Sequence, residues 1–197
     1  ITMQWDKHQI QVSAYGDGII RICELNNGKQ PYSAAVELTV EQQQKVAVAQ
    51  YQVSEQGAST VFETALLRAE VEPDGTITFY NKKNNEKLTC VSETQEIKKT
   101  TLTEEEKAFI GMEGHESGDE VQAKVNLSLS LDEADCIYGL GDKTGVLNKR
   151  EYEYEMWNSD IPAPHEDNFK SLYKSVPFMI VLKENAVYGV FFDNHGK

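Results

Sequence analysis

The most constraining feature of this sequence is that apolar residues recur at every second position. Residues 8–15 and 121–130 alternate in this way. Successive side chains of a β-strand point to opposite faces, so the alternation predicts half-buried strands rather than helices. Short segments of this kind, spaced about 8–12 residues apart and without alternating helices, indicate an antiparallel two-sheet β-sandwich.

Turn residues divide the chain into strands. Asp17 and Gly18 predict a hairpin between residues 8–15 and 19–23. A second hairpin is predicted near the C-terminus, with strands 175–182 and 187–192. Further elements are predicted as follows: strands at 44–53, 59–72 and 76–80, turns at 26–31, 73–75 and 81–87, a two-turn helix at 102–110, and an acidic loop at 111–120. The expected organisation is one all-β domain over residues 1–197, with little helix.

Charge and cysteine content exclude several classes of function. The net charge is −13, from 32 acidic and 19 basic residues, which argues against binding nucleic acid or an anionic membrane. No apolar run approaches the roughly 20 residues of a membrane-spanning helix, and no signal peptide is visible at the start. Cys23, Cys90 and Cys136 form neither a disulfide framework nor a metal clip, so we expect a reducing, cytoplasmic location.

Residues 138–160 are the most informative segment for function, because they combine glycines, charges, amides and aromatic rings. Carbohydrates present hydroxyl groups that pair with Asp and Asn, and C–H faces that stack on Trp or Tyr. Residues 139–145 resemble a phosphate-binding loop only superficially, since the glycine spacing is wrong and no helix is expected to follow. Glycines at the end of a strand are the better interpretation.

A proline-bounded loop at residues 157–164 carries Trp157, Asn158 and Asp160. The prolines lower the entropic cost of ordering such a loop. Two interpretations stay open on the residues alone: a ligand-binding loop, or a structural turn in which Asn158 or Asp160 bonds the local backbone. Residues 151–155 alternate Glu and Tyr and predict a strand with an acidic face. The four histidines share no metal-binding spacing, so no metal or cofactor is expected.

Five sequence blocks occur in an order that closely resembles the N-terminal domain of glycoside hydrolase family 31, the α-glucosidases and their relatives. They are YGLGDKTG (138–145), LNKR (147–150), MWNSD (156–160), LYKSVPF (172–178) and YGVFFDN (188–194). The resemblance implies a galactose mutarotase-like supersandwich that precedes a (β/α)₈ barrel carrying both catalytic aspartates. The barrel's nucleophile motif does not occur in residues 1–197, so we expect this chain to hold no catalytic residue of its own.

The resemblance also implies a role for the proline-bounded loop. In the family this loop reaches over the barrel and helps to form the leaving-group (+1) sugar subsite. The loop carboxylate corresponds to Asp160, with Trp157 and Asn158 beside it. The complete enzyme is expected to be a retaining α-glycosidase of α-glucosidase type, acting on α-linked glucosides or oligosaccharides, and the chain is expected to dock on the enzyme's own barrel.

Two alternatives from other classes stay open. The chain could be a free-standing carbohydrate-binding module with no enzyme attached. It could also be an aldose epimerase, which the sandwich alone suggests and for which fold analogy is a weak argument. That enzyme needs an acid/base pair in one cleft. His165 and Glu166 are adjacent in sequence, so on a strand they would point to opposite faces.

Overall fold

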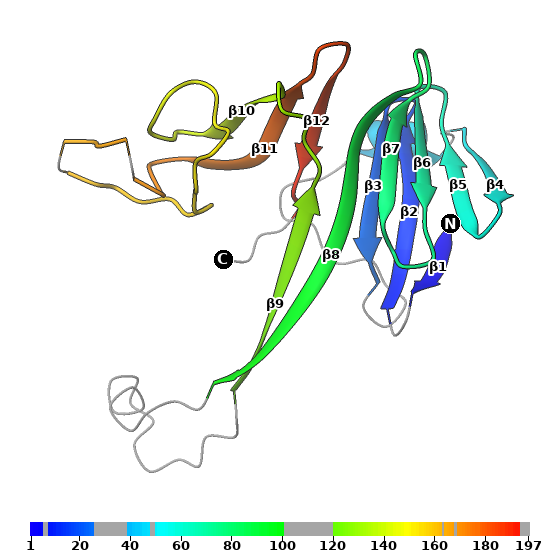
Figure 1. Ribbon diagram of the computed structural model, residues 1–197, viewed down its shortest axis with the longest axis horizontal. Coiled ribbons are helices and arrows are strands. Elements are labelled where there is room, and N and C mark those ends of the chain that lie inside the picture. Colours follow the sequence, from blue (N-terminus) through cyan, green and yellow to red (C-terminus); the bar gives the residue numbers. More distant parts are fainter. Residues whose placement is uncertain are drawn as a thin grey trace.

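Three antiparallel sheets and one helix are formed by the described residues (Figure 1). The structure is a computed structural model, and it describes residues 1–5, 8–25, 39–47, 50–100, 120–162, 164–167 and 169–193. The first sheet is β1 (Thr2–Trp5), β2 (His8–Gly16) and β3 (Ile19–Glu24). The second is β4 (Gln52–Gln56), β5 (Ser59–Glu63), β6 (Leu67–Val71), β7 (Ile77–Asn81), β8 (Glu86–Thr100) and β9 (Glu120–Leu129). The third is β10 (Cys136–Gly141), β11 (Ser175–Leu182) and β12 (Val187–Phe191).

The core lies between the first sheet and the middle of the six-stranded sheet. Its buried residues are Val12 and Ala14 of β2, with Phe62, Ala69, Val71 and Ile77 of β5 to β7. Both sheets therefore turn one apolar face inward, as the period-two pattern requires. The predicted fold class, an all-β antiparallel sandwich, is confirmed.

The two predicted hairpins are confirmed. Strands β2 and β3 pair across Asp17 and Gly18, with Gly16 opposite Ile19. Strands β11 and β12 pair with Leu182 opposite Val187. The alternating segment near residue 125 forms β9, which pairs along its whole length with β8 and extends away from the sandwich as a long two-stranded ribbon (Figure 1).

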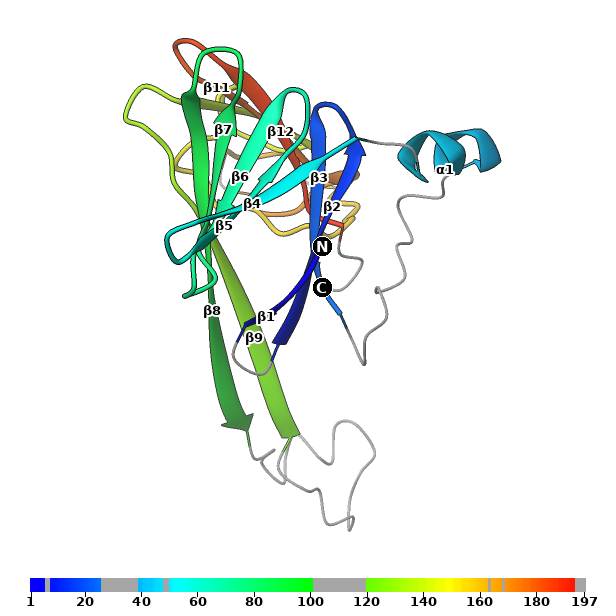
Figure 2. The same cartoon turned by 90° about the vertical axis from the view of Figure 1, so that its right-hand side faces the viewer.

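A helix replaces the first part of the strand predicted at residues 44–53. The helix α1 spans Val40–Ala47 and lies to one side of the sheets (Figure 2), and β4 begins only at Gln52. Thr39 and Gln42 bond reciprocally, since the Gln42 amide donates to Thr39 Oγ1 at 3.3 Å and the Thr39 amide donates to Gln42 Oε1 at 2.9 Å. This capping box stabilises the start of a helix, and its effect exceeds the strand preference of a short alternating run of valines. No described helix is long and apolar enough to cross a membrane.

Two other predicted strands are wrong. The strand expected at 59–72 is a hairpin of β5 and β6, broken at Thr64, whose Oγ1 accepts a hydrogen bond from the Leu67 amide at 3.1 Å. The segment 151–155 forms no strand. Its first residue, Glu151, belongs to a turn and has a φ of 70°. The predicted turn at 26–31, the helix at 102–110 and residues 111–119 of the acidic loop lie outside the described residues.

A buried ionic cluster joins the third sheet to the segment that leaves β9. The Lys183 ammonium lies 2.9 Å from Asp135 Oδ2 and 2.5 Å from Asp132 Oδ2. Burial alone lowers the pKa of Lys183, but the hydrogen bonds and charges of the two carboxylates outweigh it, so the pKa is raised. The same segment is braced by Arg150, whose Nη1 donates to the carbonyl oxygens of Asp132 at 2.6 Å and Asp135 at 2.8 Å.

Candidate functional site

The candidate site lies in the long connection between β10 and β11, which extends away from the sandwich at the end opposite β4 and β5 (Figure 1). Gly141 begins this connection with a φ of +84°, a region that glycine adopts readily. A Cβ at this position would collide with the Lys174 carbonyl oxygen and come within 2.9 Å of the Val176 nitrogen. The Asp142 amide donates to the same carbonyl at 2.8 Å, which holds the two ends of the connection together. Gly141 is the last residue of β10, in agreement with the interpretation of a glycine at a strand end.

Lys143 and Ser175 anchor the stretch that leads to Asp160. The Lys143 ammonium donates to the Glu155 carbonyl at 2.7 Å and to Ser175 Oγ at 3.0 Å. Ser175 Oγ in turn donates to the Trp157 carbonyl at 2.9 Å, and the Ser175 amide donates to Asn158 Oδ1 at 2.8 Å. Burial lowers the pKa of Lys143, partly offset by the charges of Asp142 and Glu155. Residues 155–158 are therefore fixed to the first residue of β11.

A second lysine supports the loop from inside. Lys149, only 9% exposed, donates from Nζ to the carbonyl oxygens of Lys143 at 3.2 Å and Thr144 at 2.9 Å. The Tyr154 hydroxyl also donates to the Thr144 carbonyl, at 2.8 Å, and the Lys149 ammonium lies 5.8 Å from the centre of the Tyr154 ring. Burial raises the pKa of the Tyr154 phenol. These contacts satisfy the ammonium without a carboxylate partner among the described residues, and they order residues 143–154.

Asp160 lies between two anchored neighbours. On one side, the Ser159 amide donates to the Leu172 carbonyl at 3.2 Å. On the other side, the Ile161 carbonyl lies 3.3 Å from His165 Nε2 and accepts a long hydrogen bond of 3.5 Å from the Tyr173 hydroxyl. His165 and Tyr173 are themselves 2.9 Å apart, between Nε2 and the hydroxyl oxygen. The backbone that carries the Asp160 carboxylate is thus fixed at both flanks.

The three residues predicted from the sequence lie next to one another on this loop but have different surroundings. Asp160 is exposed, and no described residue hydrogen-bonds its carboxylate. Asn158 Oδ1 accepts a hydrogen bond from the Ser175 amide, 17 positions along the chain, so Asn158 fixes the loop to β11. The Trp157 side chain is 51% exposed. An exposed carboxylate near a half-exposed indole can accept hydrogen bonds from hydroxyl groups beside an apolar surface.

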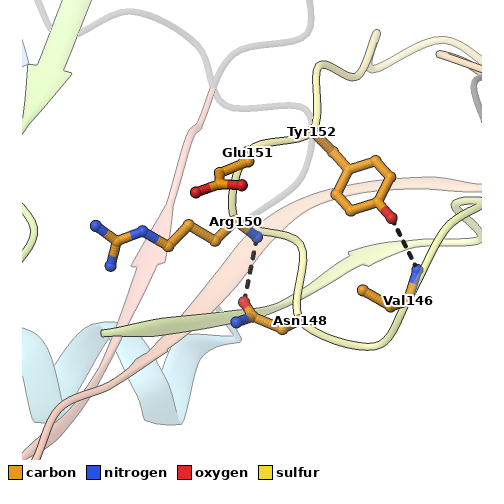
Figure 3. A pocket seen from close by; sticks show the side chains of 5 residues that line it. All are labelled: Val146, Asn148, Arg150, Glu151 and Tyr152. Atoms are coloured by element: carbon orange, nitrogen blue, oxygen red, sulfur yellow. Dashed lines mark hydrogen bonds between the residues drawn. The ribbon is translucent and has the colours of Figure 1, made fainter. Parts of the chain in front are cut away.

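An open hollow of about 430 Å³ lies elsewhere on the same connection and does not include the three predicted residues (Figure 3). Its lining residues are Val146, Asn148, Arg150, Glu151 and Tyr152. Asn148, Arg150 and Tyr152 already have internal partners, whereas the Glu151 carboxylate hydrogen-bonds no described residue. Asn148 Oδ1 accepts from the amides of Ile137 and Arg150, at 2.9 and 3.2 Å, and the Tyr152 hydroxyl accepts from the Val146 amide at 3.3 Å. We therefore interpret the hollow as the outer side of a structural turn.

Sequence reasoning missed the residues that hold the loop in place. Lys143 and Ser175 are 32 positions apart, and nothing in their local sequence indicates that they meet. His165, which the sequence offered only beside Glu166, lies within hydrogen-bonding distance of Tyr173 and Ile161. Among the described residues there is no cluster of His, Cys, Asp and Glu that could hold a metal ion.

Fold and loop together define an all-β sandwich domain with an anchored, exposed loop. Residues 9–197 match the model of the glycosyl hydrolase 31 N-terminal galactose mutarotase-like domain. The chain therefore belongs to this family of N-terminal domains.

Relatives agree with this assignment. The chain is 42% identical over 73 residues to α-glucosidase 2 of Bacillus thermoamyloliquefaciens, a match that covers 37% of this chain and 9% of that enzyme. It is 35% identical over 74 residues to an α-glucosidase of Saccharolobus solfataricus, which covers 38% of this chain and 10% of that enzyme. The matched part is thus about a tenth of the length of either relative.

Solved structures share the fold. A family 31 dextranase of Flavobacterium johnsoniae, in complex with isomaltotriose, superposes with a TM-score of 0.59 at 20% identity and covers 89% of this chain and 19% of the dextranase chain. A family 31 α-xylosidase of Xanthomonas citri gives a TM-score of 0.57 at 17% identity, over 92% of this chain and 17% of the xylosidase chain. At these identities the likeness shows the fold alone.

Proposed function

We propose that residues 1–197 form a single, non-catalytic N-terminal domain of a retaining α-glycosidase of α-glucosidase type. Family membership and the two α-glucosidase relatives support this proposal. Retaining glycosidases use two carboxylates, one as nucleophile and one as acid/base. In the complete enzyme both would be supplied by a (β/α)₈ barrel, on which this domain docks.

Within that enzyme, the anchored loop contributes to the subsite for the leaving-group sugar. The observation that carries this proposal is the exposed Asp160 carboxylate, held between the Ser159–Leu172 hydrogen bond and the contacts of Ile161. Asp160 accepts a hydrogen bond from a hydroxyl of the +1 sugar, and Trp157 stacks on that sugar or packs beneath it. Asn158 holds both in place through Ser175. A hydrogen bond to a charged group contributes about 1.5–3 kcal/mol.

Substituting Asp160→Ala in the complete enzyme tests the subsite role. We expect kcat/KM on an α-linked disaccharide to fall by about 10- to 150-fold, the kinetic equivalent of one charged hydrogen bond. An aryl α-glucoside lacks the +1 sugar hydroxyls and should lose much less. Asp167→Ala is the matched control, because it removes another exposed carboxylate from the connection between β10 and β11.

A purely structural role of Asp160 predicts different results. If Asp160 only stabilises its own turn, the substitution lowers the melting temperature and affects both substrates alike. Equal losses on disaccharide and aryl glucoside, together with a lower melting temperature, would disprove the subsite role. The Asp167→Ala variant should leave the ratio of the two activities unchanged.

We also propose a cytoplasmic location. Cys23, Cys90 and Cys136 are all described, are partly buried and form no disulfide, which suits a reducing compartment. Alkylation of the natively isolated, unfolded protein without reductant should modify all three thiols. Recovery of a disulfide-linked species would contradict the proposal.

A further inference from the structure

The sheet of β10, β11 and β12 is apolar on both faces. On β11, Met179 and Val181 point inward and are buried. The alternate residues Val176, Phe178, Ile180 and Leu182 point the other way and remain 39–47% exposed. Strand β12 continues this outward face with Phe191, opposite Phe178, and Val187, opposite Leu182. These six residues, which we call the outer apolar face, form a contiguous set on two paired strands (Figure 1).

The outward faces of the other two sheets have a different composition. On the first sheet, Val12 and Ala14 face the core, so the outward positions of β2 and β3 include Ser13 and Arg21, which lie opposite each other. On the six-stranded sheet, Arg68 and Glu70 occupy outward positions and form an ion pair of 3.2 Å. These polar side chains are only partly exposed: Arg21 is 18% exposed and pairs with Asp193, and Arg68 and Glu70 are 24% and 23% exposed. The six-stranded sheet also exposes Val125 and Leu127, both on β9. On the third sheet, by contrast, six large apolar side chains are exposed together on one side of two paired strands, and a set of this kind marks an interaction surface.

Packing within the outer apolar face positions the Phe178 ring before any partner arrives. Gly189 lies opposite Ile180, on the outward side of β12. A Cβ at Gly189 would come within 2.7 and 2.8 Å of two carbons of the Phe178 ring. The missing side chain therefore lets the Phe178 ring lie across β12, beside Phe191. A side chain that is already ordered loses little conformational entropy on docking.

The chemistry of this face fits a protein surface rather than a sugar. Sugar binding needs directed polar groups, and none of the six residues carries one. Moreover, the chain spans only 17–19% of the solved family 31 enzymes that it superposes on, so most of such an enzyme lies outside it. Resting on the proposed function, we propose that the outer apolar face is the surface of this domain that docks against the catalytic barrel of the complete enzyme.

The test introduces a charge into the face of the complete enzyme. Ile180→Lys places an ammonium at the centre of the face, where its partner residues on β10 and β12 are Tyr138 and Gly189. Ser54→Lys is the matched control, because it adds the same charge to an exposed position on the edge strand β4. We expect Ile180→Lys to speed protease cleavage between the two domains at least about 10-fold and to increase the radius of gyration by small-angle scattering. Ser54→Lys should change neither.

Each outcome decides the proposal separately from the role of Asp160. Cleavage and scattering that match the wild type in Ile180→Lys would overturn the docking assignment, even if the disaccharide-specific loss of Asp160→Ala is found. Conversely, domain separation in Ile180→Lys supports the docking assignment even if Asp160→Ala affects both substrates equally. A wild-type dimer that Ile180→Lys converts to monomers with compact, protease-resistant domains would assign the face to a second copy and overturn the proposal.

Discussion

The buried ion pair of Lys183 and Asp135 gives a strong test of what holds the third sheet in place. Both side chains are almost fully buried, with exposures of 4% and 2%, and their charged atoms are 2.9 Å apart. Asp135 Oδ2 also accepts from the Asp132 amide at 2.8 Å. Removing one partner of a buried pair leaves an uncompensated charge and costs about 3–5 kcal/mol. Asp132 remains as a second partner, so we expect Asp135→Ala to lie at the lower end, about 3 kcal/mol.

Urea unfolding of the chain, followed by circular dichroism, measures this loss. Asp132→Ala is the matched control, because its carboxylate bonds the same ammonium but is 76% exposed, so water can replace much of what the carboxylate loses. Asp135→Asn removes the charge but keeps an oxygen that can accept the hydrogen bond from the Asp132 amide. Comparing it with Asp135→Ala therefore distinguishes the effect of the charge from that of the hydrogen bond. Equal destabilisation by Asp135→Ala and Asp132→Ala would refute the reasoning, as would an Asp135→Ala variant within about 1 kcal/mol of the wild type.

Three further predictions follow from the same structure. The isolated chain should hydrolyse neither p-nitrophenyl α-glucoside nor maltose, and turnover that disappears on mutating a carboxylate within residues 1–197 would contradict a non-catalytic domain. Gly141→Ala should destabilise the chain by about 1–3 kcal/mol in urea unfolding, because φ is +84° and the new Cβ meets the Lys174 carbonyl. The hydrogen bond from Lys183 holds the pKa of the Asp132 carboxyl below its usual value. The ionised carboxylate therefore stabilises the folded chain fully above the usual pKa of about 3.9. This contribution to stability is lost as the pH falls through the lower pKa that Asp132 has in the folded state. Asp132→Asn should therefore flatten the acid limb of a stability–pH curve.

Local signals explain why much of the fold could be predicted from the sequence. The hairpin at Asp17 and Gly18 needs only a turn dipeptide between two alternating runs. Helix α1 was missed because its evidence is a reciprocal bond between Thr39 and Gln42, whereas the neighbouring valines favour a strand. The break at Thr64 was missed because its hydroxyl donates to the Asp17 carbonyl at 2.5 Å, a contact between residues 47 positions apart.

The candidate site was predictable in part for a similar reason. Residues Trp157 to Asp160 stand out as a short polar and aromatic block bounded by prolines, so the loop could be located. Its anchoring could not, because Lys143 and Ser175 belong to distant segments that only the fold brings together. The outer apolar face was also hidden, since a nearly continuous apolar run at β11 does not reveal which side will be covered.

The central claim, that Asp160 belongs to the leaving-group subsite, is tested most directly by a crystal structure of the complete enzyme. The crystal should contain a catalytically inactive variant with an α-linked oligosaccharide that spans the cleaved bond. We predict that an Asp160 carboxylate oxygen lies about 2.5–3.0 Å from a hydroxyl oxygen of the +1 sugar, with Trp157 beside or beneath that sugar. A +1 sugar bound with Asp160 turned to solvent, outside hydrogen-bonding distance of every sugar hydroxyl, would contradict the account.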